Sequence, residues 1–532
     1  MHYPLWISKL KVNVLDAVCQ DQGERMTLCE LLEKLPDPET HGDTTVTISS
    51  LTCDSRAVMP GTLFFALRGV HADGHSYIEK AVAAGAAAVV LEDASHAPAG
   101  LPWVRVSDGR TAMGLISAAF NGDPTATKPL IGITGTNGKT TTTYLIEAIL
   151  AAAGKPAAVL GTISYRFGTT VIQASHTTPE STELQCAFRQ LADAGAEAFV
   201  MEVSSHALEQ RRVDGCHFDV GIFSNLTRDH LDYHVTMESY LEAKSRLFSE
   251  LLTATPEKPH RRAAINMDDP YGAEIARRCA CPAVTFGIKG NCDVRPMAVT
   301  SSVNGISATM CTPNGEFLFT SRLLGRFNLS NILAAVAAGI ALDLPLQAIK
   351  YGVENHATVP GRMELVENRE GITCLVDYAH TGDALENVLS TLQEIATGRI
   401  ITLFGCGGDR DNGKRPIMGK IAAEMSDITV VTSDNPRTED PSAILEQIRS
   451  GIIPLGLREY RPDEAAEHFA EKGFVLLENR HEAIRLAIRL ANPGDIVLLA
   501  GKGHEDYQIL GTVKHHFDDR EEAAAAFAEK VT

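Results

Sequence analysis

With 532 residues, the chain is too long for a single hydrophobic core, because such cores stop growing at about 250–300 residues. The content of 44% hydrophobic and 22% charged residues is that of an ordinary soluble globular protein, and the net charge of −19 argues against nucleic acid or an anionic membrane surface as the main partner. The eleven cysteines form no C-x-x-C pair, which indicates reduced thiols, and only Cys279 and Cys281 lie close together.

The N-terminal stretch MHYPLWISKLKVNVLDAV lacks the apolar core of a signal peptide. The most apolar segment, NILAAVAAGIALDLPL from Asn331, is shorter than the roughly 20 residues of a membrane span, and we expect it to form a buried alanine-rich helix. These features predict a cytoplasmic protein.

Three regions differ in sequence pattern, and we expect them to form domains of residues 1–125, 126–360 and 361–532. The first mixes short strand-like runs with glycine-rich turns. In the other two, apolar runs alternate with helical patterns, which predicts an α/β fold with parallel sheets whose ligands bind at the carboxyl ends of the strands. The polar stretch from Leu455 to Phe474 is expected to be a surface excursion without a chemical role.

The stretch GITGTNGKTTT follows an apolar strand and opens a helix. Its glycines, Gly135 and Gly138, allow backbone N–H groups to converge on an anion at the helix N-terminus. Lys139 can then reach terminal phosphates, and Thr140 can hold a magnesium ion. The P-loop pattern G-x-x-x-x-G-K-[ST] fails at Ile133, where the first glycine belongs. A purely structural turn is the alternative, and the loop alone does not separate kinases, GTPases, motors and ligases.

Other polar residues follow two further apolar runs. Glu202 ends the run AFVME, where it could bind magnesium opposite the loop. The motif DHLDYH holds Asp229, His230, Asp232 and His234, and its two histidines have a spacing that could also serve zinc. Carboxylates suit magnesium better, and the spacing favours a structurally satisfied His234.

The stretch MESYLEAKSRLF predicts an amphipathic helix with Tyr240, Lys244 and Phe248 on one face. A lysine there usually covers apolar surface with its stem. It can also be desolvated, which lowers its pKa and makes the neutral amine reactive. The pattern leaves both readings open.

Three strand-end loops in the last region carry many charged residues. They contain Arg410, Lys414 and Arg415, then Asp434 and Arg437, then Lys502, His504 and Glu505. Guanidinium groups bind carboxylates in a bidentate manner, so convergence of these loops predicts a site for a small zwitterion with several carboxylates.

Six stretches carry a family resemblance: CDSRAVMPGTLFFALRGVHADGHSYI, SHTTPES, EVSSHALEQRRV, YLEAKSRLF, GCGGDRDNGKRP and SDNPRTEDP. With TGTNGKTTT, which is the family's form of the P-loop, they make the chain resemble the Mur ligases, the ATP-dependent amide-bond synthetases of peptidoglycan precursor assembly. The resemblance covers essentially the full chain. It implies an N-terminal UDP-binding domain, a central P-loop parallel-sheet ATPase domain and a Rossmann-like C-terminal amino-acid-binding domain.

The resemblance also implies an ADP-forming acid–amino-acid ligase of cell-wall biogenesis. ATP would phosphorylate the D-glutamate side chain of UDP-N-acetylmuramoyl-L-alanyl-D-glutamate, and the amine of meso-2,6-diaminopimelate would attack the acyl phosphate. In this family the tetrapeptide DNPR accompanies diaminopimelate, whereas members that add L-lysine carry other residues there. Mg²⁺ is the implied cofactor, and the expected protein is a monomer with no nucleic-acid or membrane partner.

The resemblance also implies the roles of individual site residues. The implied ATP contacts are Gly135, Thr136, Asn137, Gly138, Lys139, Thr140, Thr141, Asn328 and Arg362. The implied metal ligands are Thr140, Glu202 and His230, and the implied catalytic residues are Lys139, Lys244 and His230. The UDP-linked substrate would contact Ser55, His71, Ala72, His176, Thr177, Thr178, Ser204, Gln210 and Arg212. The diaminopimelate would contact Arg410, Asp434, Asn435, Pro436, Arg437, Gly501 and Glu505. Lys244 would be carbamylated to N6-carboxylysine, an anion able to support a second magnesium ion.

Three rival functions remain at this point. A folylpolyglutamate-type synthetase shares the last two domains but lacks the N-terminal stretch CDSR…GVHADG. A nucleotide-operated regulatory protein would hydrolyse ATP without forming a bond. The same ligase could instead use L-lysine.

Overall fold

The computed structural model describes residues 25–69, 72–229, 231–253, 255, 258–356, 358–468 and 471–530. By their contacts these residues form two compact units. The first comprises the described residues up to Arg295 together with Thr312–Asn314 and Ala334–Gly352, and the second comprises Pro296–Cys311, Gly315–Leu333 and the described residues from Val353 onward. The predicted division into three domains stays a prediction.

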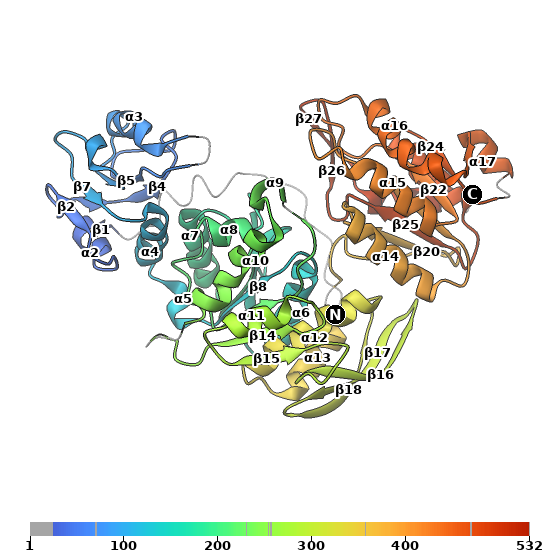
Figure 1. The fold of residues 1–532 in the computed structure, drawn as a ribbon, viewed down its shortest axis with the longest axis horizontal. Coiled ribbons are helices and arrows are strands. Elements are labelled where there is room, and N and C mark those ends of the chain that lie inside the picture. The colour runs from blue at the N-terminus through green and yellow to red at the C-terminus, as the bar shows by residue number, and fades with distance from the viewer. Residues whose placement is uncertain are drawn as a thin grey trace. The chain divides into compact units, whose positions relative to one another are not determined.

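The first unit begins with a five-stranded sheet in the order β2-β7-β6-β5-β4, in which only β2 is antiparallel to its neighbour (Figure 1). The strands of this region are β1 (Met26–Thr27), β2 (Glu39–His41), β3 (Thr47–Ile48), β4 (Ser50–Thr52), β5 (Thr62–Phe65), β6 (Ala88–Leu91) and β7 (Trp103–Arg105). Its helices are α2 (Leu28–Leu32), η1 (Gly74–Tyr77), α3 (Ile78–Ala83), η2 (Ala94–His96), α4 (Gly109–Phe120) and α5 (Pro124–Thr127).

The larger sheet of the first unit has eight strands in the order β11-β10-β9-β12-β8-β13-β14-β15. All neighbours from β9 to β15 are parallel, whereas β10 and β11 are antiparallel. The strands are β8 (Leu130–Thr134), β9 (Ala157–Leu160), β10 (Ser164–Phe167), β11 (Thr170–Gln173), β12 (Ala198–Glu202), β13 (Val220–Phe223), β14 (Arg262–Asn266) and β15 (Ala283–Phe286). The helices are α6 (Lys139–Ala152), α7 (Ser181–Asp193), α8 (Ser205–Glu209), α9 (Leu231–His234), α10 (Met237–Arg246), the π-helix η3 (Leu247–Leu251) and α11 (Gly272–Arg278).

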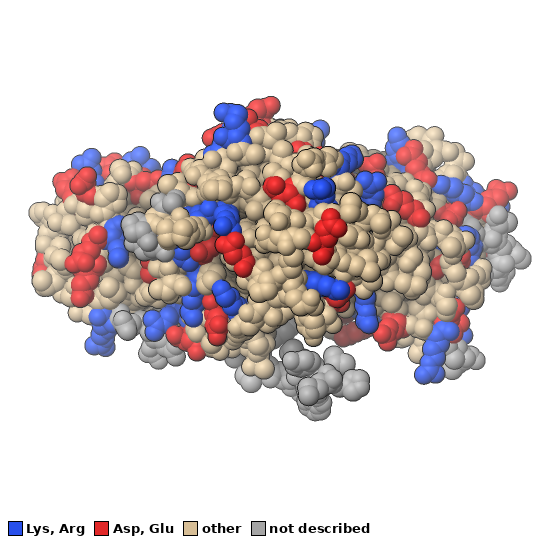
Figure 2. All heavy atoms as spheres, turned by 90° about the horizontal axis from the view of Figure 1, so that it is seen from below, with Lys and Arg blue, Asp and Glu red and all other residues tan. Residues whose placement is uncertain are grey.

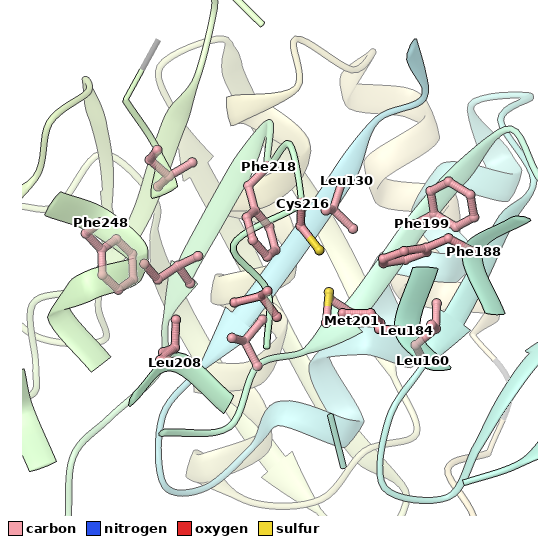
Figure 3. Close-up of a cluster of buried hydrophobic side chains, with 14 of the residues drawn as sticks. Leu130, Leu160, Leu184, Phe188, Phe199, Met201, Leu208, Cys216, Phe218 and Phe248 are labelled. Carbon is pink, nitrogen blue, oxygen red and sulfur yellow. The ribbon is translucent and has the colours of Figure 1, made fainter. Parts of the chain in front are cut away.

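The core beside this sheet is built from apolar strand residues and the helices that cover them. Figure 3 shows Phe188 of α7 against Phe199 of β12, with ring centroids 4.8 Å apart, and Leu130 of β8 nearby. Because parallel strands are buried on both faces, β8 and β12 read as continuous apolar runs. The burial fixes the register of the strands whose carboxyl ends carry the predicted nucleotide loop.

The second unit holds a seven-stranded sheet in the order β19-β20-β25-β21-β22-β24-β23, parallel except at β19. Its strands are β19 (Glu364–Val366), β20 (Thr373–Asp377), β21 (Ile400–Phe404), β22 (Ile428–Val431), β23 (Arg458–Tyr460), β24 (Gly473–Leu476) and β25 (Ile496–Ala500). The helices are α14 (Gly382–Ile395), α15 (Lys414–Met425), α16 (Pro441–Ile452), η4 (Ile453–Leu455), α17 (Pro462–His468), α18 (Arg480–Leu490) and α19 (Asp519–Lys530). The remaining strands are β16 (Arg295–Ser302), β17 (Gly305–Thr312), β18 (Gly315–Ser321), β26 (Tyr507–Leu510) and β27 (Val513–His516).

The α/β class predicted from the alternation of strands and helices is confirmed, but two details differ. The three-stranded sheet of β16, β17 and β18 was not predicted. The prediction of a surface excursion from Leu455 is wrong for β23, which pairs in parallel with β24 and buries Tyr460 at the edge of the sheet. This short strand contains two charged residues before Tyr460, so its sequence shows no strand pattern.

The alanine-rich segment forms a helix, as predicted. It lies in α12 (Arg326–Ala341), most of whose side chains from Leu329 onward are buried, and α13 (Leu346–Asn355) follows it. Within the described ranges, none of the helices combines the length and apolar character that crossing a membrane requires. Figure 2 shows acidic and basic side chains interspersed over one face of the described residues.

Candidate active site

The loop between β8 and α6 is hydrogen-bonded through Thr136 and Asn137 to residues that follow β13. Gly135 and Gly138 have φ angles of 147° and 87°, which glycine adopts at little cost. A Cβ atom on Gly135 would lie 1.9 Å from the Ser224 Oγ, so only glycine fits. The Asn137 N–H donates to the Asn225 side chain, and the Ser224 Oγ donates to the Asn137 carbonyl, both at 2.8 Å. The loop is thus a rigid set of backbone groups at a helix N-terminus, as phosphate binding requires.

Two lysine side chains converge on one carbonyl oxygen of this loop. The Lys139 Nζ donates to Gly135 O at 2.9 Å, and the Lys244 Nζ donates to the same oxygen at 3.1 Å. Lys244 is 1% exposed, and its Nζ lies 4.5 Å from the centroid of the Tyr240 ring. Burial, followed by the positive charge of Lys139, lowers the pKa of Lys244 well below its ordinary value. The buried Nζ does not reach solvent as that of a surface-covering lysine would. The chemical role of Lys244 stays a prediction.

Glu202 ends β12 beside the head of α6. Its Oε1 accepts a hydrogen bond from the Thr140 hydroxyl at 3.0 Å. Thr162, which follows β9, donates its backbone N–H at 3.0 Å and its hydroxyl at 3.1 Å to the same carboxylate. A buried carboxylate beside hydroxyl groups is an all-oxygen donor set and fits Mg²⁺. Sequence reasoning missed Thr162, because its contact with Glu202 depends on the order of the strands.

The motif DHLDYH is only partly visible, because His230 lies outside the described residues. His234 is buried, with its Nε2 2.8 Å from the Ser205 Oγ and its Nδ1 3.6 Å from a Glu209 oxygen. The interpretation of His234 as a structurally satisfied histidine is therefore confirmed. Among the described residues, no three or more His, Cys, Asp or Glu side chains lie together as a candidate metal site.

The residues predicted to bind the muramoyl dipeptide form one hydrogen-bonded network next to Glu202. The Thr178 hydroxyl donates to the Glu202 backbone carbonyl at 2.8 Å and accepts from the Ser204 N–H at 3.0 Å. Arg212 donates to the Thr178 carbonyl at 2.9 Å and to the Gln210 Oε1 at 2.7 Å. The structure thus brings these four predicted residues together beside the loop.

The other residues assigned to the UDP-linked substrate are less connected. The Thr177 hydroxyl lies 3.1 Å from that of Thr162, and His176 accepts a hydrogen bond on its carbonyl from the Tyr165 hydroxyl. Ser55 is half-buried in the turn after β4, and Ala72 accepts on its carbonyl from the Gly69 N–H at 2.9 Å. His71 lies outside the described residues. The roles of these residues stay predictions.

Asn328 and Arg362, the remaining predicted ATP contacts, belong to the second unit. The Asn328 side chain donates to the Leu324 carbonyl at 2.9 Å. The Arg362 guanidinium lies 4.8 Å from the centroid of the Tyr378 ring. Their contact with nucleotide stays a prediction.

We expect Glu202→Gln to remove most of the gain in nucleotide affinity that magnesium provides. The amide keeps the shape of the side chain but loses the negative charge beside Thr140, which should weaken metal-dependent binding by about 10- to 100-fold. Calorimetric titration of ADP with and without Mg²⁺ measures this gain, with Glu183→Gln, whose carboxylate accepts from the Ser175 hydroxyl, as the control. An unchanged gain in the Glu202 variant would exclude a metal role.

The three charged loops of the second unit contact one another, as their place at the carboxyl ends of β25, β21 and β22 predicts. An Arg437 NH group donates to the Gly408 carbonyl at 2.8 Å, and the Asn435 amide donates to Glu505 at 2.9 Å. Lys502 lies 3.3 Å from the Asp434 carboxylate. A cluster of guanidinium, ammonium and carboxylate groups therefore forms at this sheet edge.

Lys502 is the buried cation at the centre of this cluster, with a side chain that is 0% exposed. Its Nζ donates to the Tyr507 carbonyl at 2.6 Å and lies 3.6 Å from the Glu505 carboxylate. Burial and the negative charge of Asp434 raise the pKa of Glu505, and Lys502 opposes this shift. Lys502 thus stabilises two carboxylates that would otherwise repel each other.

The remaining residues of this cluster differ in exposure. Arg410 is exposed and donates to the Asp409 carbonyl, and the Gly501 N–H donates to the Asp377 carbonyl at 3.0 Å. A Cβ on Gly408 would lie 1.8 Å from the Pro436 carbonyl oxygen, so Pro436 packs directly on the glycine loop. The grouping of Arg415 with the site cations of these loops is wrong, because its fully buried guanidinium is bound by Glu439 and Gln447.

We expect Lys502→Met to lower the free energy of unfolding by about 3 kcal/mol at neutral pH, because it leaves two carboxylates next to each other in a largely buried site. Without the cation, the pKa of Glu505 rises further above its unfolded value. The folded variant therefore binds more protons than the unfolded chain, and its deficit should shrink as the pH falls toward that pKa. Urea unfolding at several pH values measures the effect, with the exposed Lys420→Met as the control. Equal stability of the two variants would contradict it.

Family models match most of the chain. The Mur ligase family, catalytic domain model matches residues 47–121, the Mur ligase middle domain model matches 133–339, and the Mur ligase, glutamate ligase domain model matches 361–503.

Relatives match over nearly the full length. The UDP-N-acetylmuramoyl-L-alanyl-D-glutamate--2,6-diaminopimelate ligase of Geobacter metallireducens is 62% identical over 504 residues, which cover 95% of this chain and 99% of the relative. The ligase of the same name from Geobacillus kaustophilus is 44% identical over 505 residues, 95% of this chain and all of the relative. A solved structure of a ligase with this name is similar with a TM-score of 0.69 and 34% identity, and the match covers 96% of this chain and 100% of the other. The chain therefore belongs to the Mur ligase family.

Proposed function

We propose that this protein is the ATP-dependent ligase that adds meso-2,6-diaminopimelate to UDP-N-acetylmuramoyl-L-alanyl-D-glutamate during peptidoglycan precursor synthesis. The observation that carries the proposal is the 62% identity, over 95% of the chain, with a protein named for this reaction. The two strand-edge clusters supply the chemistry, one with paired lysines at a phosphate loop and one with guanidinium and carboxylate groups.

In the proposed reaction the D-glutamate carboxylate attacks the γ-phosphorus of ATP and forms an acyl phosphate with release of ADP. The amine of diaminopimelate then attacks the acyl carbon, phosphate leaves with the carbon–oxygen bond electrons, and the amine loses a proton as the amide forms. Lys139 and the loop N–H groups neutralise charge on the transferred phosphoryl group, which is the main requirement of such chemistry. Lys139 would leave the carbonyls of its own loop to reach the phosphates.

Thr140 and Glu202 would hold a magnesium ion, which supplies charge neutralisation at the phosphate oxygens when bound. Lys244, as a neutral amine, would react with carbon dioxide to give a carbamate and release a proton. The carbamate is an anion beside the loop and would take part in holding metal together with His230. Thr177, Thr178, Ser204, Gln210 and Arg212 would position the muramoyl dipeptide.

For the amino acid, Arg437 would bind the distal carboxylate of diaminopimelate, which L-lysine lacks. Asp434, Asn435 and Glu505 would receive its ammonium group, and Arg410, Pro436 and Gly501 would complete the pocket.

The test is an assay of product formation with the UDP-linked dipeptide, ATP and a panel of amino acids, read by mass spectrometry. We expect the product with meso-diaminopimelate and little with L-lysine. Preferential use of L-lysine would overturn the proposed amino acid, and the absence of product with every amino acid would overturn the proposed reaction.

A further inference from the structure

Two thiols face each other at the end of α11, outside the site described above. The Cys279 and Cys281 sulfur atoms are 3.6 Å apart, and both side chains are partly exposed. Cys279 caps α11 with an extended backbone (φ −68°, ψ 131°), and in extended chain residues i and i+2 point to the same side. The local sequence Cys-Ala-Cys therefore places the two thiols in contact.

The electrostatics of the pair make one thiol reactive. A hydrogen bond joins the two sulfur atoms, and either thiol can be its donor. With Cys281 as the donor, this bond lowers the pKa of Cys279 to about 7, while the pKa of Cys281 is raised. By contrast, burial raises the pKa of Cys216, Cys374 and Cys406. The thiolate is the nucleophilic form, so at neutral pH we expect oxidants to react with Cys279 rather than with these buried thiols.

Metal binding explains the pair less well than oxidation does. A closed zinc site needs four ligands, and in the described part of the chain no three or more His, Cys, Asp or Glu side chains gather as metal ligands. A thiolate in contact with a second thiol is instead the arrangement from which a disulfide forms. Its sulfur atoms must approach from 3.6 Å to about 2.05 Å, which requires movement of the segment that carries them.

This segment is attached to the helix that carries Lys244. The Ala280 N–H, between the two cysteines, donates to the Phe248 carbonyl at 3.0 Å. Arg278, just before them, forms an ion pair with Glu242 of α10. Phe248 lies one helical turn beyond Lys244, where the π-helix η3 continues α10. Movement of the Cys279–Cys281 segment thus acts directly on the support of that helix.

We propose that Cys279 and Cys281 form a reversible thiol–disulfide site, oxidised by hydrogen peroxide, whose closure alters the packing of the Lys244 helix. The Cys279 thiolate attacks one peroxide oxygen, the O–O bond breaks, and with one proton taken up a sulfenic acid and water form. The Cys281 sulfur then attacks the Cys279 sulfur, which forms the S–S bond and releases the second water. The pair loses two electrons, which reduce the peroxide. The site does not depend on the proposed ligase reaction.

The first experiment is peptide mapping of the full chain after oxidation. Trypsin cleavage after Arg278 and Lys289 releases residues 279–289, which contain both cysteines and no third. After treatment with peroxide and alkylation with iodoacetamide, we expect this peptide to be lighter by two hydrogen atoms than its reduced form, unalkylated, and restored by dithiothreitol. A doubly alkylated peptide, or a sulfinic acid on one cysteine only, would overturn the proposal.

Two variants and an additional measurement, hydrogen exchange, complete the test. Cys281→Ser should abolish disulfide formation in the peptide, whereas Cys292→Ser, which removes a buried thiol elsewhere, should leave it unchanged. Hydrogen exchange of residues 237–251 should change on oxidation of the wild type and stay unchanged in Cys281→Ser. Identical exchange of this segment in reduced and oxidised wild type would overturn the link to the Lys244 helix. None of these readouts requires ligase activity.

Discussion

Replacing Lys244 with methionine should lower the rate of ligation by about 10²- to 10³-fold, the size expected when one group that stabilises developing charge is removed. Methionine fills similar space beside Tyr240 but cannot form a carbamate or donate to the Gly135 carbonyl. Steady-state rates of ADP release with all substrates measure the loss. A variant of full activity would remove Lys244 from the reaction.

The same substitution should raise the free energy of unfolding. That result would show that the loss of activity is not a failure to fold. Burial lowers the pKa of Lys244 in the folded protein, so below the ordinary lysine pKa the unfolded chain binds a proton that the folded chain does not. Without carbon dioxide, wild-type stability should therefore rise with pH from the lowered pKa up to the ordinary one, and the methionine variant should lack this slope. Thermal unfolding across that range measures it.

The carbamate itself can be detected directly. Incubation with ¹³C-labelled bicarbonate should give a carbamate carbon signal in the NMR spectrum of the wild type and none in Lys244→Met. Lys258→Met provides a control, because its lysine is also buried but is bound to Asp219. A signal of equal size in Lys244→Met and in the wild type would contradict modification at Lys244.

Replacing Arg437 with methionine should reduce the preference for diaminopimelate over L-lysine by at least about 10²-fold. A site built to pair with a polar group of its substrate strongly rejects an analogue that lacks this group. The guanidinium already donates to the Gly408 carbonyl, so it is held at the sheet edge before substrate arrives. The measurement is the ratio of kcat/KM for the two amino acids. An unchanged ratio would exclude Arg437 as the selective residue.

Two further variants sharpen this result. Arg437→Lys keeps the charge but loses the planar fork, so it should recover only part of the preference. Arg449→Met removes another arginine of the second unit, whose ion pairs with Glu446 and Glu459 lie at the surface. This control should leave the ratio unchanged.

The strands that carry the site could be predicted from sequence because each is a buried apolar run that ends in glycine or polar residues. β8, β12, β21 and β25 all lie within such runs. The convergence of the loops followed from the rule that parallel strands present their carboxyl ends at one edge. The side-by-side order of the strands, however, is set by tertiary packing and could not be predicted from the sequence.

The residues that sequence reasoning missed depend on that order. Thr162 reaches Glu202 only because β9 lies next to β12. Lys502 and Arg415 looked alike as loop cations, but one lies among the predicted site carboxylates and the other is bound to Glu439 and Gln447. The edge strand β23 has too few apolar residues to show a pattern, and its pairing with β24 is a long-range effect.

The most direct test measures ADP release by the purified protein with each organic substrate supplied alone, together, or withheld. We expect rapid release only when the UDP-linked dipeptide and diaminopimelate are both present, with one amide product formed per ADP. Equal release without either substrate would contradict it and would support a nucleotide-operated protein that forms no bond.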